Sequence, residues 1–243
     1  MRRLLRVLFY GTLILIGMGV YFAKKNNKDL VKGNGVVVSD TRASEEFEHI
    51  RIGGAFEVML RQGSGYSVDI EADENLQDHI VTDVSNQTLD IHTEGHIGKF
   101  EKMKVTITAP KFSSVETSGG VVLSSDNQLS GTSLKVKASG ASKVNLDIAM
   151  ESIHSEFSGA GDITFSGEAA SATVNISGAG KLRAYDLKTH EMHVSISGAG
   201  YAEVNADQKL DLNVSGAGKV NYKGNPSDVS KSISGAGHIE AVN

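Results

Sequence analysis

A short motif rich in small residues recurs seven times in the second half of this chain. Most copies read Ser-Gly-Ala-Gly, and they begin, at intervals of 18 to 21 residues, at Ser118, Ser139, Ser158, Ser177, Ser197, Ser215 and Ser234. A period near 20 residues is typical of solenoids, in which each repeat is one structural unit stacked on the next. This repeat constrains the fold more than any other feature of the sequence.

The apolar residues around the motif indicate the kind of solenoid. They lie mostly one, three and five places before the first Ser, and again five and seven places after it. Leu210, Leu212 and Val214, for example, precede the copy at Ser215. A spacing of two is the period of a β-strand with one buried face. We therefore predict an all-β solenoid with coils of about 19 residues.

The glycines of the motif predict a change of direction. An even number of residues separates the last apolar position before the motif from the first one after it, so a straight strand would point both glycines into the core. Such a strand would point Ser and Ala outward. Glycine inside a strand pattern usually marks a bulge or a tight bend. We predict a corner or a flattened edge at each motif.

The composition excludes several classes of partner and site. The net charge is -5, only 6% of the residues are aromatic, and Lys and Arg are scattered among acidic residues. The chain thus has neither the basic stripe nor the stacking platforms of nucleic-acid-binding proteins. It contains no Cys, which excludes disulfides, thiolate metal sites, a thiol nucleophile and a lipoprotein anchor.

The N-terminus predicts export. Three arginines lie before an uncharged apolar run at residues 7–23, and three lysines follow it within five residues. The run is short for a membrane-spanning helix and long for the core of a signal peptide. We interpret residues 1–25 as a hydrophobic helix that is a retained signal anchor; a cleaved signal peptide and a buried core helix remain alternatives. The flanking charges do not fix an orientation, and we expect a membrane-anchored periplasmic or cell-surface protein.

The remaining chain divides into a linker at 26–44 and a β-solenoid at 45–243, with an entry and cap region at 45–112 and the seven coils at 113–243. Strand-like alternation of apolar residues occurs in the entry region at residues 50–52, 56–60, 68–70, 89–91 and 103–107. A short helix competes with strand between Glu74 and Val84, where apolar residues are four positions apart.

Three segments together resemble a known family. They are Ile52-Gly53-Gly54-Ala55-Phe56-Glu57-Val58-Met59-Leu60-Arg61-Gln62-Gly63, then Glu71-Ala72-Asp73-Glu74-Asn75-Leu76, and, after the Ser-Gly-Ala-Gly array, Tyr222-Lys223-Gly224-Asn225-Pro226. With the array they resemble the putative auto-transporter adhesin head GIN domain, a domain of unknown function common in Bacteroidetes-type bacteria. The resemblance covers Phe47 to Asn243. It implies a right-handed parallel β-helix-like fold, an envelope location and a role in adhesion, and it brings no catalytic or binding residues.

The histidines do not form a convincing metal site. His190 and His193 would face opposite sides of a strand, whereas His92 and His96 share a face but bracket a turn that contains glycine. We predict ordinary surface histidines at all four positions.

An acidic series at Asp69, Glu71 and Asp73 would line one face of a strand. Carboxylate oxygens in this arrangement could hold a hard cation. The alternating Val68 and Ile70 supply the buried face of the same strand, so a solvated polar face is the prediction. The sequence thus predicts no catalytic residue, no cofactor site and no metal site.

The function predicted from these observations is a noncatalytic envelope module, an adhesin or binding domain acting through a flat repetitive face. The candidate residues of that face are Ser158, Ala160, Ser177, Ala179, Ser197, Ala199, Ser215, Ala217, Ser234 and Ala236. We expect a protein, glycan or surface ligand, membrane association through the N-terminus and no nucleic acid. A structural spacer or homo-oligomerisation module is one alternative. A carbohydrate-active β-helix enzyme, which would need converging acidic residues, is the other.

Overall fold

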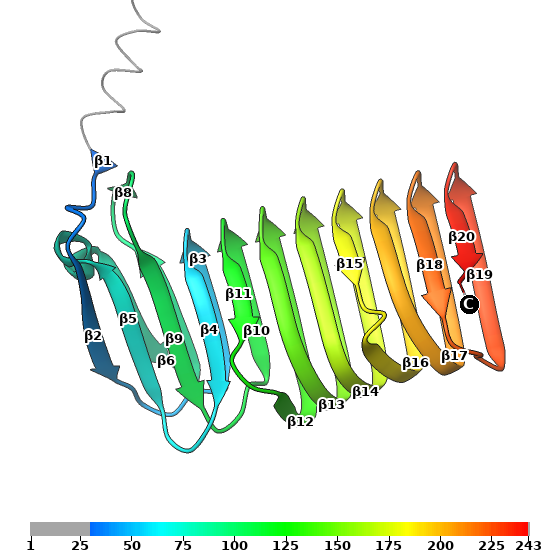
Figure 1. Cartoon of the computed structure of the whole chain (residues 1–243), viewed down its shortest axis with the longest axis horizontal. Coiled ribbons are helices and arrows are strands. Elements are labelled where there is room, and N and C mark those ends of the chain that lie inside the picture. The colour runs from blue at the N-terminus through cyan, green and yellow to red at the C-terminus, as the bar shows by residue number, and fades with distance from the viewer. Residues whose placement is uncertain (1–29, 243) are drawn as a thin grey trace, which may run out of the picture.

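The computed structural model describes residues 30–242 and shows an all-β solenoid (Figure 1). The N-terminal hydrophobic helix predicted from the sequence lies outside these residues. Within them the only helix is the short 3-10 helix η1 (Glu74–His79), and none is long and apolar enough to cross a membrane.

The repeat region forms a column of parallel strands. Its strands are β10 (Ser114–Gly119), β11 (Val122–Ser125), β12 (Leu129–Gly140), β13 (Lys143–Gly159), β14 (Asp162–Gly178), β15 (Lys181–Arg183), β16 (Leu187–Gly198), β17 (Tyr201–Gly216), β18 (Lys219–Lys223), β19 (Asp228–Gly235) and β20 (His238–Ala241). Each coil pairs in parallel with the next, and the seven motif serines lie in register from Ser118 to Ser234. The predicted solenoid is confirmed; its right-handed sense stays a prediction.

Each motif is a tight corner, as predicted. The first glycine of every copy has a positive φ, for example +113° at Gly159 and +122° at Gly198, and it is exposed. A straight strand with both glycines inside is therefore wrong. The second glycine is buried at Gly180, Gly200 and Gly218. Figure 1 shows these corners as the row of narrow bends along one edge of the column.

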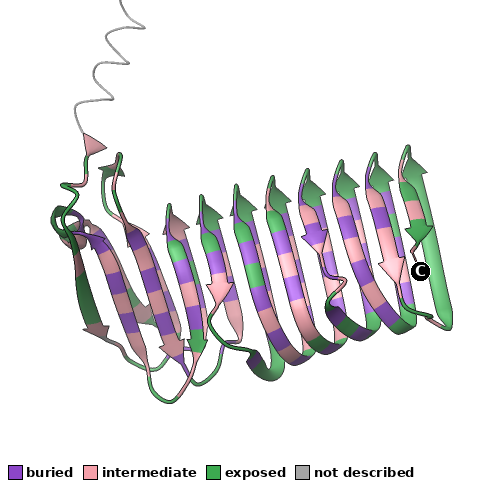
Figure 2. Ribbon diagram, in the orientation of Figure 1, coloured by how far each residue is buried: buried purple, intermediate pink, exposed green. Residues whose placement is uncertain are grey.

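The core lies between the two sides of the flattened coils. Figure 2 shows buried residues alternating with others along each strand, which is the period of two that the sequence predicts. Phe165 is 1% exposed, and its ring centroid lies 6.3 Å from that of Phe157. The apolar rows run continuously from coil to coil, so each coil buries the apolar side chains of its neighbours.

Ser155 is a polar residue among the apolar rows of the core. Ser155 is 0% exposed, and its hydroxyl has no hydrogen-bond partner among the described residues. Its register partners in the adjacent coils are Val136 and Val174. An unsatisfied buried hydroxyl costs about 1–3 kcal/mol. We expect Ser155→Val to raise the free energy of unfolding by about 1 kcal/mol in urea denaturation; a lower value would contradict this account.

The entry region is built in a different order from the repeats. Its strands are β1 (Leu30–Val31), β2 (Val37–Ala43), β3 (His49–Gly54), β4 (Glu57–Gln62), β5 (Ser67–Asp73), β6 (Ile80–Ser85), β7 (Thr88–Thr93), β8 (His96–Ile97) and β9 (Met103–Ala109). The coil β3–β4 lies between β10–β11 on one side and β7–β9 on the other. Antiparallel strands β2, β5 and β6 then close this end of the column. The short helix predicted in this region ends at His79, and Ile80 and Val84 belong to β6.

Asp73 corrects the prediction of a solvated acidic face. Asp69 and Glu71 are partly exposed, but Asp73 is 0% exposed. Its carboxylate accepts hydrogen bonds from the backbone N–H groups of Gly35 (2.9 Å), Glu101 (3.0 Å) and Lys102 (3.0 Å). The strand alternation ends at this residue because two segments distant in sequence cover it. Asp73 therefore holds these two segments against the end of β5.

Candidate binding face

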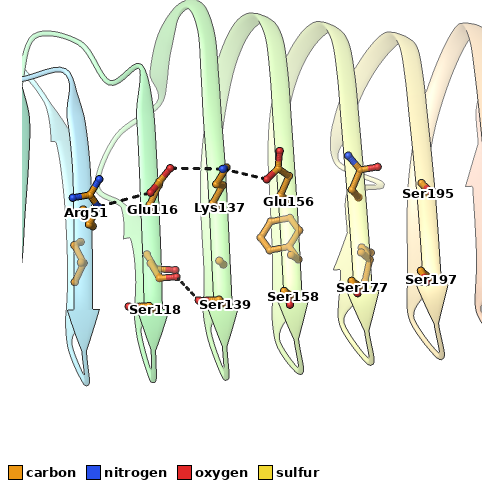
Figure 3. Close-up of a pocket in the computed structure, with 16 residues that line it drawn as sticks. Arg51, Glu116, Ser118, Lys137, Ser139, Glu156, Ser158, Ser177, Ser195 and Ser197 are labelled. Carbon is orange, nitrogen blue, oxygen red and sulfur yellow. Dashed lines mark hydrogen bonds and ion pairs between the residues drawn. The ribbon is translucent and has the colours of Figure 1, made fainter.

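A shallow groove of about 490 Å³ runs along the column beside the corners. It lies on the side formed by the strands that lead into the motifs, and it extends from β3 to β16 (Figure 3). The exposed motif serines form one border of the groove, since their side chains point outward from successive coils. Residues two places before each Ser point outward as well and form the other border.

The structure separates the serines from the alanines of the motif. All ten candidate residues are exposed. Ser158, Ser177 and Ser197 line the groove, together with the two earlier motif serines. Ala160 and Ala179 instead line a second hollow of about 470 Å³, which the residues that follow the corner form. Ser215, Ser234 and the other three alanines line neither hollow.

Charged residues alternate along the border of the groove opposite the serines. Arg51, Glu116, Lys137 and Glu156 occupy successive rungs of the stack. Lys137 Nζ lies 3.9 Å from Glu116 Oε1 and 3.4 Å from Glu156 Oε2. Arg51 Nε lies 3.9 Å from Glu116 Oε2 (Figure 3). These pairs are partly exposed and add little to stability, but they fix the position of the charges along the groove.

The next rungs along the same row are uncharged. Asn175 is in register with Glu156, and Ser195 is in register with Asn175. The groove therefore has a charged half and a neutral half. This row is not apparent in any local stretch of the sequence, because its members are 19 or more residues apart. It becomes visible only when the positions two places before each motif Ser are aligned.

Glu156 is the best-connected carboxylate of the groove. His154 Nε2 donates a hydrogen bond to it over 2.9 Å, and Lys135 Nζ lies 3.6 Å away. This hydrogen bond, opposed by partial burial and supported by Lys135 and Lys137, lowers the pKa of Glu156 below its usual value. The side chain is thus held as a carboxylate at neutral pH and can accept hydrogen bonds.

Three of the four predicted surface histidines pair with separate carboxylates. His190 Nδ1 lies 3.0 Å from Asp207 Oδ1, and His193 Nδ1 lies 3.1 Å from Asp211 Oδ2. His92 Nδ1 lies 2.8 Å from Asp90 Oδ1 in the same strand, and His96 lies in the separate strand β8. Across residues 30–242, no three His, Asp or Glu side chains converge as metal ligands would.

Comparison with known protein families gives a match to one model, described as "Putative auto-transporter adhesin, head GIN domain". The match covers residues 46–226, which is most of the chain. The chain belongs to this family. The GIN domain accordingly includes the entry region from β3 onward, the groove and all but the last coil of the column. No curated protein matches the chain.

Solved structures share the fold of this GIN domain. A putative adhesin from Bacteroides fragilis is 24% identical, with a TM-score of 0.83 over 87% of this chain and 100% of that one. A putative adhesin from Parabacteroides merdae is 22% identical, with a TM-score of 0.71 over 88% and 100% of the two chains. A putative lipid binding protein from Parabacteroides distasonis is also 22% identical, with a TM-score of 0.74 over 88% and 99%. At these identities the likeness concerns the fold.

Proposed function

We propose that this GIN domain is a noncatalytic, adhesin-like binding module of the cell envelope that contacts its ligand through the serine groove. The observation that carries the proposal is the groove itself, which crosses five motif-bearing coils and is bordered by exposed serines. The hydroxyls repeat at about 4.8 Å, the spacing of stacked strands. This arrangement suits an extended protein or glycan segment that lies along the column and contacts several coils.

The location follows from the same proposal. The uncharged apolar run at residues 7–23 precedes the described domain by only a few residues, and it would hold the column close to a membrane. The adhesin descriptions of the family and of the structural neighbours support display at the envelope. We propose a membrane-anchored periplasmic or cell-surface domain.

The carboxylates of the groove favour binding over hydrolysis. Glu116 and Glu156 lie two rungs apart with Lys137 between them. Both carboxylates are paired with this lysine. A glycosidase needs one carboxylic acid whose pKa is raised so that it can donate a proton. The pKa of Glu156 is lowered instead, so we propose that these groups accept hydrogen bonds from a ligand.

A ligand screen with matched variants tests the proposal. The full chain is applied to an array of glycans and matrix proteins, beside the variant S158R/S177R and the control N145R. Ser158 and Ser177 line the groove, whereas Asn145 is exposed on the strand that follows a corner. Two arginine side chains would occupy the groove and exclude a ligand sterically. We expect the double variant to bind at least about tenfold more weakly, a loss of about 1.4 kcal/mol of binding free energy.

The control should bind like the wild type, because its single arginine adds positive charge outside the groove. Equal binding by all three proteins would place the ligand on another surface. A screen in which the wild type binds nothing would favour the spacer alternative, in which the repeats only build a rigid column.

A further inference from the structure

The last coil of the described column exposes side chains that the other coils bury. Val229 and Ile233 in β19 are 39% and 46% exposed, whereas their register partners Leu210 and Val214 in β17 are 0% exposed. In residues 30–242, β19 pairs with β17 and β20 pairs with β18, and no strand pairs with their outer edges. Open backbone groups beside apolar side chains form a template for pairing with another chain.

One residue in this coil departs from the repeat. Lys231 is in register with Leu212, and Leu212 is in register with Val194 in the coil before. Both of these apolar side chains are 0% exposed. Lysine thus occupies an inward position of the coil. Its Nζ atom lies 4.6 Å from the centroid of the Tyr222 ring, a distance at which a cation is attracted to the face of an aromatic ring.

The partner that fits this end is a second copy of the chain. The exposed coil is built from the repeat that stacks on itself, strand beside parallel strand, throughout the column. The same coil of a second copy could meet it across a two-fold axis, with its strands running antiparallel to β19 and β20. Such a partner would cover the Lys231 ammonium with apolar side chains. Burial of an unpaired charge is costly, and strands at sheet edges commonly carry inward-pointing charges that prevent pairing.

We propose that Lys231, held over Tyr222, closes this end of the column to a second copy of the chain. The inference concerns the end of the column rather than the serine groove, so it is independent of the proposed binding function. It turns the homo-oligomer alternative into a specific expectation: the wild type does not stack through this end, and loss of one charge allows it to do so.

The test places a spin label on the end itself. Ser232 is exposed and points outward from β19, so S232C carries a nitroxide without entering the core. In the labelled full chain we expect K231L to raise the fraction of label pairs with measurable dipolar coupling to about tenfold above the background level at equal concentration. The wild type should show no coupling above background.

Three further variants make the result specific. K143L adds the same apolar side chain at an exposed, outward position in mid-column, and it should show no increase. K231R retains the charge and should also show no increase. K231V should couple as K231L does, and it replaces K231L in the test if the larger leucine side chain prevents the chain from folding. The proposal is overturned if both apolar variants match the wild type, if K143L couples equally, or if the wild type and K231R already couple at this end.

Discussion

Gly198→Ala is expected to destabilise the column by about 3 kcal/mol or more. Gly198 has a φ of +122°, which side chains other than glycine rarely adopt, and a Cβ atom there would lie 2.5 Å from the carbonyl oxygen of Gly178 in the coil below. Backbone strain of this kind costs about 1–3 kcal/mol. The clash adds to it, because that oxygen accepts a hydrogen bond from the Ala199 N–H over 2.9 Å and cannot move freely.

Chemical denaturation followed by circular dichroism measures this effect. Ser197→Ala is the matched control, since the adjacent Ser197 is exposed, and substitutions at such sites usually change stability by less than about 0.5 kcal/mol. Equal midpoints for the two variants would mean that the corner tolerates a side chain. The repetition of glycine at this position of the motif would then have a cause other than the backbone geometry of the corner.

Asp73→Ala is expected to lower the free energy of unfolding by about 3–5 kcal/mol. The substitution removes the carboxylate that accepts hydrogen bonds from the N–H groups of Gly35, Glu101 and Lys102, and a hydrogen bond to a charged group contributes about 1.5–3 kcal/mol. Asp73→Asn keeps one acceptor oxygen, so we expect a smaller loss. Hydrogen exchange should rise first at these three amides; unchanged protection there would contradict the assigned role.

The same carboxylate should make the domain sensitive to acid. Burial raises the pKa of Asp73, but the backbone hydrogen bonds from Lys102, Gly35 and Glu101 outweigh burial and leave the pKa below its ordinary value of 3.8. A depressed folded pKa means that the stabilisation is present above the unfolded pKa and is lost as the pH falls through the folded one. Stability of the wild type should therefore fall more steeply below about pH 4 than that of Asp73→Asn.

The repeat predicted the column because its period and alternation are local properties of the sequence. The rows of valine, leucine and isoleucine fixed which face is buried, and the glycines fixed the corners. The entry region was predictable only as a set of strands: nothing in residues 50–107 indicates that β7 and β9 lie outside β3 and β4. Strand order there depends on contacts between distant segments, which periodicity does not report.

The candidate site was predictable in part for the same reason. The exposed serines follow from the motif, but the row that includes Lys137 and Glu156 arises from stacking of side chains from different coils. The burial of Asp73 depends on Gly35, Glu101 and Lys102, which lie at least 28 positions away. No pattern within β5 distinguishes this aspartate from the partly exposed acidic residues before it.

The position of the β3–β4 coil makes the entropy of chain closure unequal along the molecule. His49 must meet Ser114, which lies 65 positions later, whereas contacts between later coils, such as that of Ser152 with Thr132, join residues about 20 positions apart. Each doubling of a closed loop costs about 0.6 kcal/mol more. Contacts of long range also slow folding. The end nearest the N-terminus is therefore the topologically demanding part of the chain, and the repeats can add to it one short loop at a time.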